Sequence, residues 1–248
     1  MSGEELSVAL AKIRPHVNSG LAHQKTPAVL LNALESTLKE QRAEQTPTAY
    51  FAALVTALGG LIQKDGTSAL EEGDNVPAAL YLLATVVPFV PQVVLRSQLS
   101  TITSLLGPLF PALAPHAPPL RSQIAIFGSV ILALDNAHLN HSGVRQIFAC
   151  ILELAADQRP KVRRKAAETV KDILSAPPAP LAQHPFGELV ATWIQTKLAS
   201  AARGGDKMTD GADVAIHVLA FTKPISTYLP ESVCHIFGML CDSLTFRL

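Results

Sequence analysis

The stretch that decides the fold runs from Ile147 to Ser175 and reads IFACILELAADQRPKVRRKAAETVKDILS. Its first part repeats apolar residues at the spacing of one helix face, and the segment from Asp157 to Pro160 interrupts that spacing. A proline fits the first turn of a new helix, because the N–H that it lacks would have no partner there. The second part carries another apolar stripe, formed by Val162, Ala166, Ala167, Val170, Ile173 and Leu174. The stretch therefore predicts two short helices folded back on each other, with the stripe of the second helix buried.

The order of an apolar helix, Asp157, the segment PKVR (160–163) and a pair of alanines resembles a HEAT repeat. Because such a helical hairpin cannot bury both of its faces alone, one hairpin predicts others stacked beside it. Leu120-Arg121 and Val162-Arg163 both open the second helix of a hairpin, and their separation falls within the HEAT period of about 40–47 residues. We therefore expect an all-α fold, a HEAT/armadillo-type α-solenoid of stacked antiparallel helix pairs, with roughly nine to twelve helices.

The composition agrees with a packed helical protein. The chain has 248 residues, of which 48% are hydrophobic and only 16% charged, so it can bury a large core and is not a disordered chain. Its 20 basic and 20 acidic residues cancel. The overall charge therefore gives no argument for nucleic-acid binding, and any such argument depends on a local patch. No period-two alternation is long enough to predict a sheet.

We expect a single α-helical repeat domain over residues 1–248, with mobile loops near 65–75 and 200–212, where glycine and polar residues gather. Thr26-Pro27 and Thr46-Pro47 look like two helix starts, each with an N-cap threonine and a first-turn proline. A last helix is expected from Val233 to Leu244. A solenoid normally has polar caps at its ends, and Leu248 ends the chain without one. We therefore expect the N-terminal part of a longer protein.

One segment, from Val76 to Leu95, is apolar enough to raise the question of a membrane span. Pro88 and Pro91 would break a spanning helix near its end, so we predict a buried helix followed by a proline-marked turn, and no contact with a membrane. The N-terminus lacks the basic start and apolar run of a signal peptide.

The three cysteines, Cys150, Cys234 and Cys241, form no C-x-x-C pair. Because they fall on apolar helices, we expect reduced and little-exposed thiols, with no role as metal ligands.

No nucleotide-binding, zinc-protease or serine-hydrolase motif is present. His138 and His141 lie near Asp135 and could hold a metal; the alternative is a polar loop between helices, since metal sites usually have three or four convergent ligands. We predict no catalytic residue, no metal and no cofactor, and no small-molecule substrate. An enzyme or enzyme subunit that uses the His138 and His141 region is the rival hypothesis.

The helix start after Asp157 is rich in basic residues: Arg159, Lys161, Arg163, Arg164 and Lys165, with Lys171 further on. A helix N-terminus adds positive potential, so this region could bind phosphate or an acidic partner. The alternative is that Arg163 pairs with Asp157 or with a neighbouring repeat, while the others are simply solvated. We predict an exposed partner- or RNA-binding patch of Arg159, Lys161, Arg164 and Lys165, with Arg163 partly structural.

Residues 12–41, KIRPHVNSGLAHQKTPAVLLNALESTLKEQ, and 48–54, TAYFAAL, resemble the start of the eukaryotic ribosomal-RNA-processing protein 12 family. The most distinctive pieces are KIRPH (12–16), QK (24–25) and TAYF (48–51). The resemblance implies a nuclear and nucleolar scaffold of α-helical repeats that shuttles to the cytoplasm and has no catalytic residues. It also implies partners among pre-ribosomal particle proteins, pre-rRNA and nuclear transport factors, and a role in small-subunit maturation and export.

The KIRPH region is also rich in basic and titratable side chains. Lys12, Arg14, His16 and Lys25 are basic or titratable, and no acidic residue occurs from Ala11 to Leu34. These four side chains are candidate contacts with RNA or an acidic protein surface. The alternative is a linker that packs Ile13 and Leu21 on the first hairpin.

Two functions of the same architecture remain open from the residues alone. The first is a non-enzymatic HEAT-repeat scaffold in ribosome biogenesis. The second is a nuclear-transport-receptor-like or other adaptor solenoid that binds a protein peptide, which needs the same fold.

Overall fold

The computed structural model describes residues 2–65, 70–71, 73–203 and 208–230. Throughout these residues the regular elements are helices, with no strand, so the all-α prediction is confirmed. The chain forms two compact units, Met1–Leu134 and Asp135–Leu248, called the first and second unit below.

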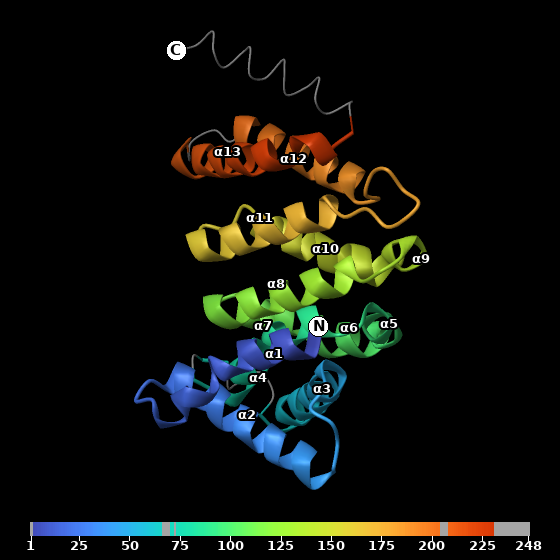
Figure 1. The fold of residues 1–248 in the computed structure, drawn as a ribbon. Helices are drawn as coiled ribbons and strands as arrows, with labels where there is room; N and C mark the ends of the chain where they lie inside the picture. Colours follow the sequence, from blue (N-terminus) through green and yellow to red (C-terminus); the bar gives the residue numbers. More distant parts are fainter. Residues whose placement is uncertain (1, 66–69, 72, 204–207, 231–248) are drawn as a thin grey trace. The chain divides into compact units, whose positions relative to one another are not determined.

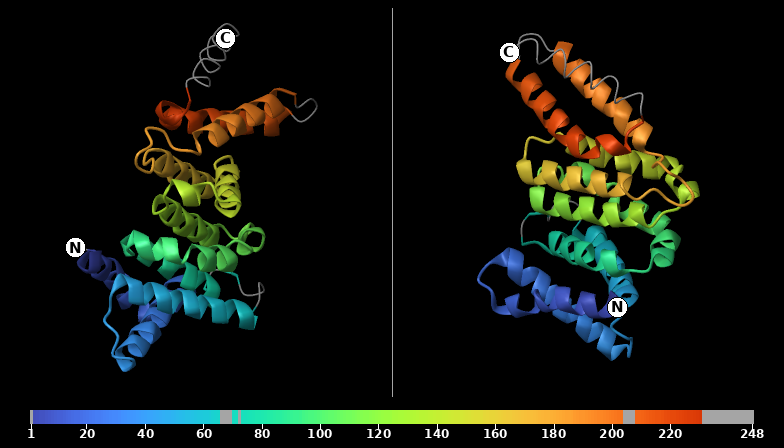
Figure 2. Two further views of the ribbon diagram at one scale, coloured as in Figure 1. Left: turned by 90° about the vertical axis from the view of Figure 1, so that its right-hand side faces the viewer. Right: turned by 45° about the horizontal axis from the view of Figure 1, so that its top comes forward.

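Helix α4 is the centre of the first unit. It packs against α2, α3 and α8, and α1 also contacts it (Figures 1 and 2). In chain order, the helices of this unit are α1 (Ser2–Ala11), η1 (Arg14–Asn18), α2 (Ala22–Glu40), α3 (Pro47–Asp65), α4 (Asn75–Val86), η2 (Val87–Phe89), α5 (Gln92–Ser97), α6 (Leu99–Leu106), α7 (Leu109–Leu113) and α8 (Ala117–Leu132).

The long apolar segment from Val76 to Leu95 is the buried helix and turn that the prolines predict. Helix α4 ends at Val86, a short 3-10 turn holds Pro88, and α5 begins after Pro91. Eight of the twelve residues of α4 are buried. In the described part of the chain, no helix has the length and apolar character needed to cross a membrane.

The second unit contains the hairpin that decides the fold. Its helices are α9 (Asn136–Leu139), α10 (Ser142–Leu154), α11 (Pro160–Leu174), α12 (Gly187–Arg203), α13 (Met208–Thr222) and η3 (Lys223–Tyr228). Helices α10 and α11 pack together, and so do α12 and α13 (Figure 1). The stripe residues Val162, Ala166, Val170 and Ile173 are fully buried, as predicted, whereas Ala167 is only half-buried.

Short helices make the count differ from the expected nine to twelve. The described residues hold thirteen α-helical segments, because the region between Gln92 and Leu113 is divided into α5, α6 and α7. Gly107 and Pro108 separate the last two of these.

Several predictions fall partly or wholly outside the described residues. These are the helix from Val233 to Leu244 with Cys234 and Cys241, and residues 66–69, 72 and 204–207 of the two predicted loops. The third cysteine, Cys150, has a free, half-buried thiol, and burial raises the pKa of that thiol. Of the predicted loop near 200–212, residues up to 203 belong to α12 and those from 208 belong to α13. In the predicted loop near 65–75, Leu70 is buried.

One of the two predicted threonine-proline helix starts is wrong. Helix α3 begins at Pro47, and the Oγ1 of Thr46 accepts a hydrogen bond from the N–H of Ala49 at 3.2 Å, as an N-cap does. Helix α2 instead begins at Ala22 and contains Pro27. Thr26 donates its hydroxyl to the carbonyl oxygen of Gly73 at 2.7 Å, so it joins α2 to the segment before α4.

Candidate partner-binding surfaces

In the first unit, Arg14 is held by Glu35 of α2. The Arg14 guanidinium donates two hydrogen bonds to Glu35 Oε1, at 3.1 Å from Nε and 2.8 Å from Nη2. The Tyr50 hydroxyl of α3 donates to the same oxygen at 2.9 Å. The hydrogen bond to Glu35 raises the pKa of Arg14, while burial, together with Glu35, raises the pKa of Tyr50 to about 12. Arg14, Glu35 and Tyr50 therefore tie η1, α2 and α3 together.

The rest of the KIRPH region divides between packing and exposure. Ile13 is buried, as the linker alternative expects, but Leu21 is exposed. Lys12 and Lys25 are exposed and His16 is half-buried, and the described residues offer no hydrogen bond or ion pair to their side chains. The structure thus brings Arg14 into an internal ion pair and leaves Lys12, His16 and Lys25 as candidate contacts.

In the second unit, Asp157 organises the turn before α11. Its Oδ1 accepts hydrogen bonds from the backbone N–H of Arg159 at 2.8 Å and from Arg159 Nε at 2.9 Å, and its Oδ2 accepts from Arg159 Nη2 at 2.8 Å. The Arg159 guanidinium holds the pKa of this carboxyl below its usual value. Arg159 is therefore part of the turn, although it was expected in the exposed patch.

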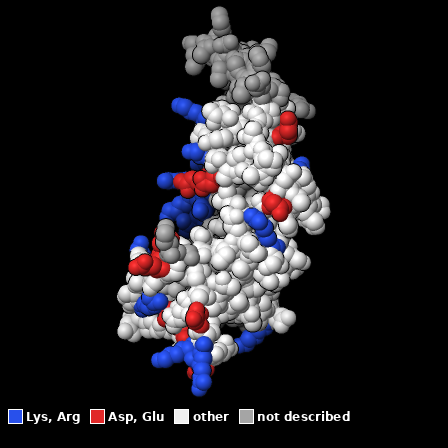
Figure 3. Space-filling model, turned by 45° about the vertical axis from the view of Figure 1, so that its right-hand side comes forward, with Lys and Arg blue, Asp and Glu red and all other residues white. Residues whose placement is uncertain are grey.

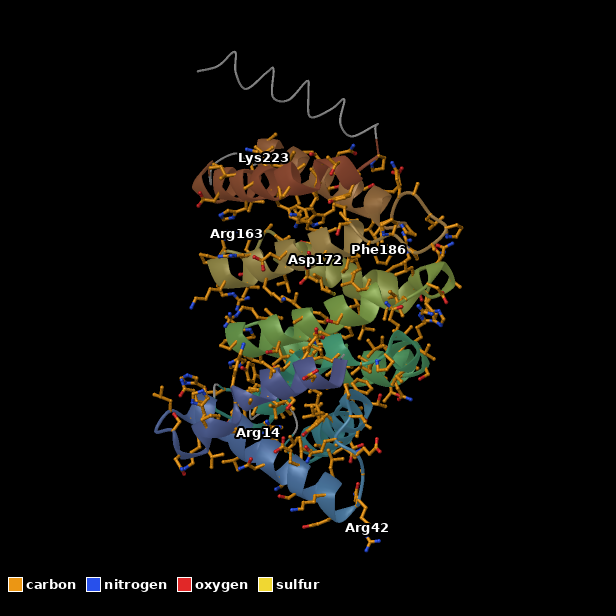
Figure 4. All side chains as sticks on the ribbon, in the orientation of Figure 1. Arg14, Arg42, Arg163, Asp172, Phe186 and Lys223 are labelled. Carbon is orange, nitrogen blue, oxygen red and sulfur yellow. The ribbon has the colours of Figure 1, made fainter. Side chains whose placement is uncertain are left out.

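Arg163 binds the same turn through main-chain oxygens. Its Nη1 donates to the carbonyl of Asp157 at 2.7 Å and to that of Gln158 at 3.1 Å. Figure 4 shows Arg163 near the start of α11 and Asp172 further along the same helix. The prediction that Arg163 bonds the loop and is partly structural is confirmed.

The remaining basic side chains of α11 are more accessible. Arg164 Nε donates to Glu168 Oε1 at 2.8 Å, and the two side chains are 80% and 54% exposed. Lys161 is exposed and Lys165 is half-buried, and within the described residues neither ammonium group has a hydrogen-bond or ion-pair partner. On the face drawn in Figure 3, charged side chains are sparse, and blue and red atoms lie next to each other at several places.

Sequence reasoning missed a polar cluster between α10 and α12. The Trp193 indole donates to Glu153 Oε1 at 2.8 Å, and Lys197 Nζ lies 2.6 Å from Glu153 Oε2. Lys197 also lies over the Trp193 ring, 5.8 Å from its centroid. An amphipathic pattern shows that Trp193 faces the core, but it does not show which polar residue on another helix meets the indole nitrogen.

The histidines of the rival enzyme hypothesis act at helix starts. Asp135 Oδ1 accepts from the His138 backbone N–H at 3.0 Å and lies 2.7 Å from His138 Nδ1. His141 Nδ1 accepts from the Gly143 N–H at 3.3 Å. Across the residues that the structure describes, no group of three or more His, Cys, Asp and Glu side chains is placed to hold a metal ion.

Packed helix pairs, a proline-started second helix and an arginine that binds the preceding turn together define a HEAT-type helical-repeat protein. Comparison with known families agrees: residues 18–242 match the family described as "RRP12-like, N-terminal HEAT repeats". The chain belongs to this family. The predicted resemblance and the predicted HEAT-type α-solenoid are confirmed.

Three curated relatives from different organisms are similar to this chain. The chain is 32% identical, over 79% of its length, to Ribosomal RNA-processing protein 12 of Saccharomyces cerevisiae. It is 29% identical over 73% of its length to Putative ribosomal RNA-processing protein 12 of Schizosaccharomyces pombe, and 24% identical over 92% to RRP12-like protein of Homo sapiens. The chain spans about a sixth of the length of these relatives. No solved structure matches it significantly.

Proposed function

We propose that this chain is a non-enzymatic scaffold in ribosome biogenesis, acting in small-subunit rRNA processing, pre-ribosome maturation and nuclear export. The observation that supports the proposal is the family match over residues 18–242, together with relatives named ribosomal RNA-processing protein 12. Its partners are then pre-ribosomal particle proteins, with pre-rRNA and nuclear transport factors as further partners. Its location is the nucleus and nucleolus, with shuttling to the cytoplasm.

The accessible basic side chains are the proposed contacts. In the first unit these are Lys12, His16 and Lys25, and in the second unit Lys161, Arg164 and Lys165. Arg14 and Arg159 are paired with Glu35 and Asp157 and are only 34% and 35% exposed, against 80% for Arg164, so we assign them to the scaffold rather than to the contact surface.

Affinity purification of the tagged full-length protein tests this function. We expect small-subunit precursor particles, with pre-rRNA and assembly proteins, to be recovered. Recovery of transport cargo or an adaptor complex without pre-rRNA would instead support the peptide-binding adaptor function. Recovery of neither would refute both scaffold functions.

The contact surfaces have their own test within the same purification. Reversing Arg164 and Lys165 to Glu should lower the yield of particles, and the loss should shrink as the salt concentration rises, because exposed charges are screened. A yield equal to that of the native chain at low salt would show that these two side chains only solvate the surface.

A further inference from the structure

The outer face of α11 carries charges of both signs. It consists of the side chains that project away from the buried stripe, namely Lys161, Arg164, Lys165, Glu168, Lys171 and Asp172. Lys165 is half-buried, and the other five residues are exposed. The two halves of the helix differ, because the basic residues dominate its first turns and both acidic residues come later.

The basic start of this face does not stabilise the helix. The N-terminal end of a helix carries partial positive charge, which favours acidic side chains there and disfavours basic ones. The first turn of α11 contains no acidic residue, while Lys161, Arg164 and Lys165 occupy its first two turns. A local arrangement that opposes helix stability is typical of a functional surface.

The acidic residues decide which class of partner fits. A nucleic acid presents a continuous row of negative phosphates, which Glu168 and Asp172 would repel along the second half of the face, where Lys171 is the one basic residue. Glu168 also already accepts the hydrogen bond of Arg164, which a phosphate would have to displace. The face offers no aromatic side chain on which a base could stack. A protein segment with charges of both signs can place a basic side chain opposite Glu168 and Asp172 and needs no stacking partner, so it suits this face better than a nucleic acid does.

We propose that the outer face of α11 docks a protein segment whose charge pattern is the reverse of its own. Lys161 and Lys165 are four residues apart on a helix, so their positions differ by about 6 Å along its axis. Two carboxylates on alternate residues of an extended segment are about 6–7 Å apart and match that spacing. A basic side chain of the same segment then lies opposite Glu168 and Asp172. The inference rests on the proposed scaffold function and specifies one of its partners as a protein.

Binding of defined probes to the whole chain tests the proposal. The probes are two labelled peptides of alternating Glu-Ala and Lys-Ala repeats, one with the Glu half first and one with the Lys half first, and a seven-nucleotide oligouridylate. We expect one of the two peptides to bind more tightly than the other and more tightly than the oligouridylate, measured by fluorescence anisotropy at low salt. The double variant Lys161→Glu/Lys165→Glu should raise the Kd of the preferred peptide by a factor of at least about ten.

A matched control separates the face from overall charge. Lys39→Glu/Lys64→Glu makes the same charge change on two exposed lysines of the first unit and should alter the Kd by less than about twofold. The double variant Glu168→Lys/Asp172→Lys should bind the preferred peptide less tightly and the oligouridylate more tightly than the native chain does. Circular dichroism shows that each variant is folded.

Three outcomes would overturn the proposal. The first is that the native chain binds oligouridylate more tightly than either peptide. The second is that Lys161→Glu/Lys165→Glu and the control Lys39→Glu/Lys64→Glu weaken peptide binding equally. The third is that neither peptide binds the native chain measurably. Each of these outcomes can be told apart from a failure of the proposed ribosomal function, because the peptide-binding assay does not need ribosomal particles. A chain that binds the peptide but recovers no particles would keep the docking face and refute the ribosomal role.

Discussion

Asp157 shows how much one loop carboxylate can do in this protein. It accepts three hydrogen bonds from Arg159, and its pKa is lowered mainly by the Arg159 guanidinium. Asp157→Asn should therefore lower the free energy of unfolding by about 1–3 kcal/mol at neutral pH. Urea midpoints measure the difference.

The pH dependence of that difference follows from the sign of the pKa shift. The folded-state pKa of Asp157 lies below the ordinary aspartate value of 3.8, so its contribution to stability is fully present above that pH. It is lost as the pH falls through the lowered pKa, and the gap between the native chain and Asp157→Asn should close in acid. A gap that stays constant down to about pH 2 would contradict the role of the charge. Glu168→Gln, which breaks an exposed pair, should leave the midpoint unchanged.

His184 gives a second prediction with a different pH window. It is buried, its Nδ1 accepts the N–H of Phe186 at 3.2 Å, and burial lowers its pKa to about 4. In the unfolded chain this histidine is protonated below about pH 6.5, whereas in the folded chain it stays neutral down to about pH 4. As the pH is lowered from about 6.5 to 4, the free energy of unfolding should therefore fall by about 1.4 kcal/mol per pH unit. His184→Asn keeps an acceptor but does not titrate, and it should flatten the slope. If thermal melts give the native chain and His184→Asn the same pH dependence of stability, that dependence comes from other titrating groups.

Residue roles were predictable from the sequence only where the partner is near in the chain. Arg163 lies six residues from Asp157 and was expected to bond the turn, which the structure confirms. Arg14 meets Glu35, 21 residues away, only because η1 and α2 pack together. The sequence shows that no acid lies between Ala11 and Leu34, but it does not show that the next residue turns back towards Arg14.

At the scale of elements, the same dipeptide has two outcomes. Thr46-Pro47 starts α3, whereas Thr26-Pro27 lies inside α2. The dipeptide is the same in the two places, but the hydroxyl of Thr26 donates to the carbonyl of Gly73, 47 residues away, whereas that of Thr46 caps its own helix. The α10–α11 hairpin was predictable because its turn, its proline and its stripe are all local signals.

Gly73 lies close to the first residue of α2. Its φ is +106°, and a Cβ atom added there would lie 2.8 Å from the Cβ of Ala22. Gly73→Ala should therefore destabilise the protein by about 1–3 kcal/mol, through backbone strain and the close contact. Chemical unfolding followed by circular dichroism measures this.

Gly60 provides the matched control within the same unit. It lies in α3 with nothing within 4 Å of an added Cβ, so Gly60→Ala should stabilise the protein by about 0.5–1 kcal/mol. A stabilising Gly73→Ala, or equal effects of the two changes, would mean that the backbone at Gly73 is not constrained as the structure shows.

At the scale of the whole molecule, the fold was predictable because one helical repeat predicts further repeats packed against it. One hairpin with two apolar faces requires others, and the family match over residues 18–242 confirms that requirement. The division of the chain between Leu134 and Asp135 had no counterpart in the sequence pattern. Periodicity gives the faces of helices, whereas the grouping of helices into compact units depends on which long-range contacts form.

The sequence predicts a single repeat domain over residues 1–248, and we propose that these residues unfold as one cooperative unit. The chain has a single tryptophan, Trp193 in the second unit, whose indole is bonded to Glu153. Its fluorescence therefore reports the second unit, while circular dichroism reports all helices. In a coupled array, Gly73→Ala in the first unit should lower the tryptophan transition by about 2–4 °C per kcal/mol lost. If the fluorescence transition stays in place while the dichroism signal falls earlier, the two units unfold independently, and the single-domain proposal is wrong.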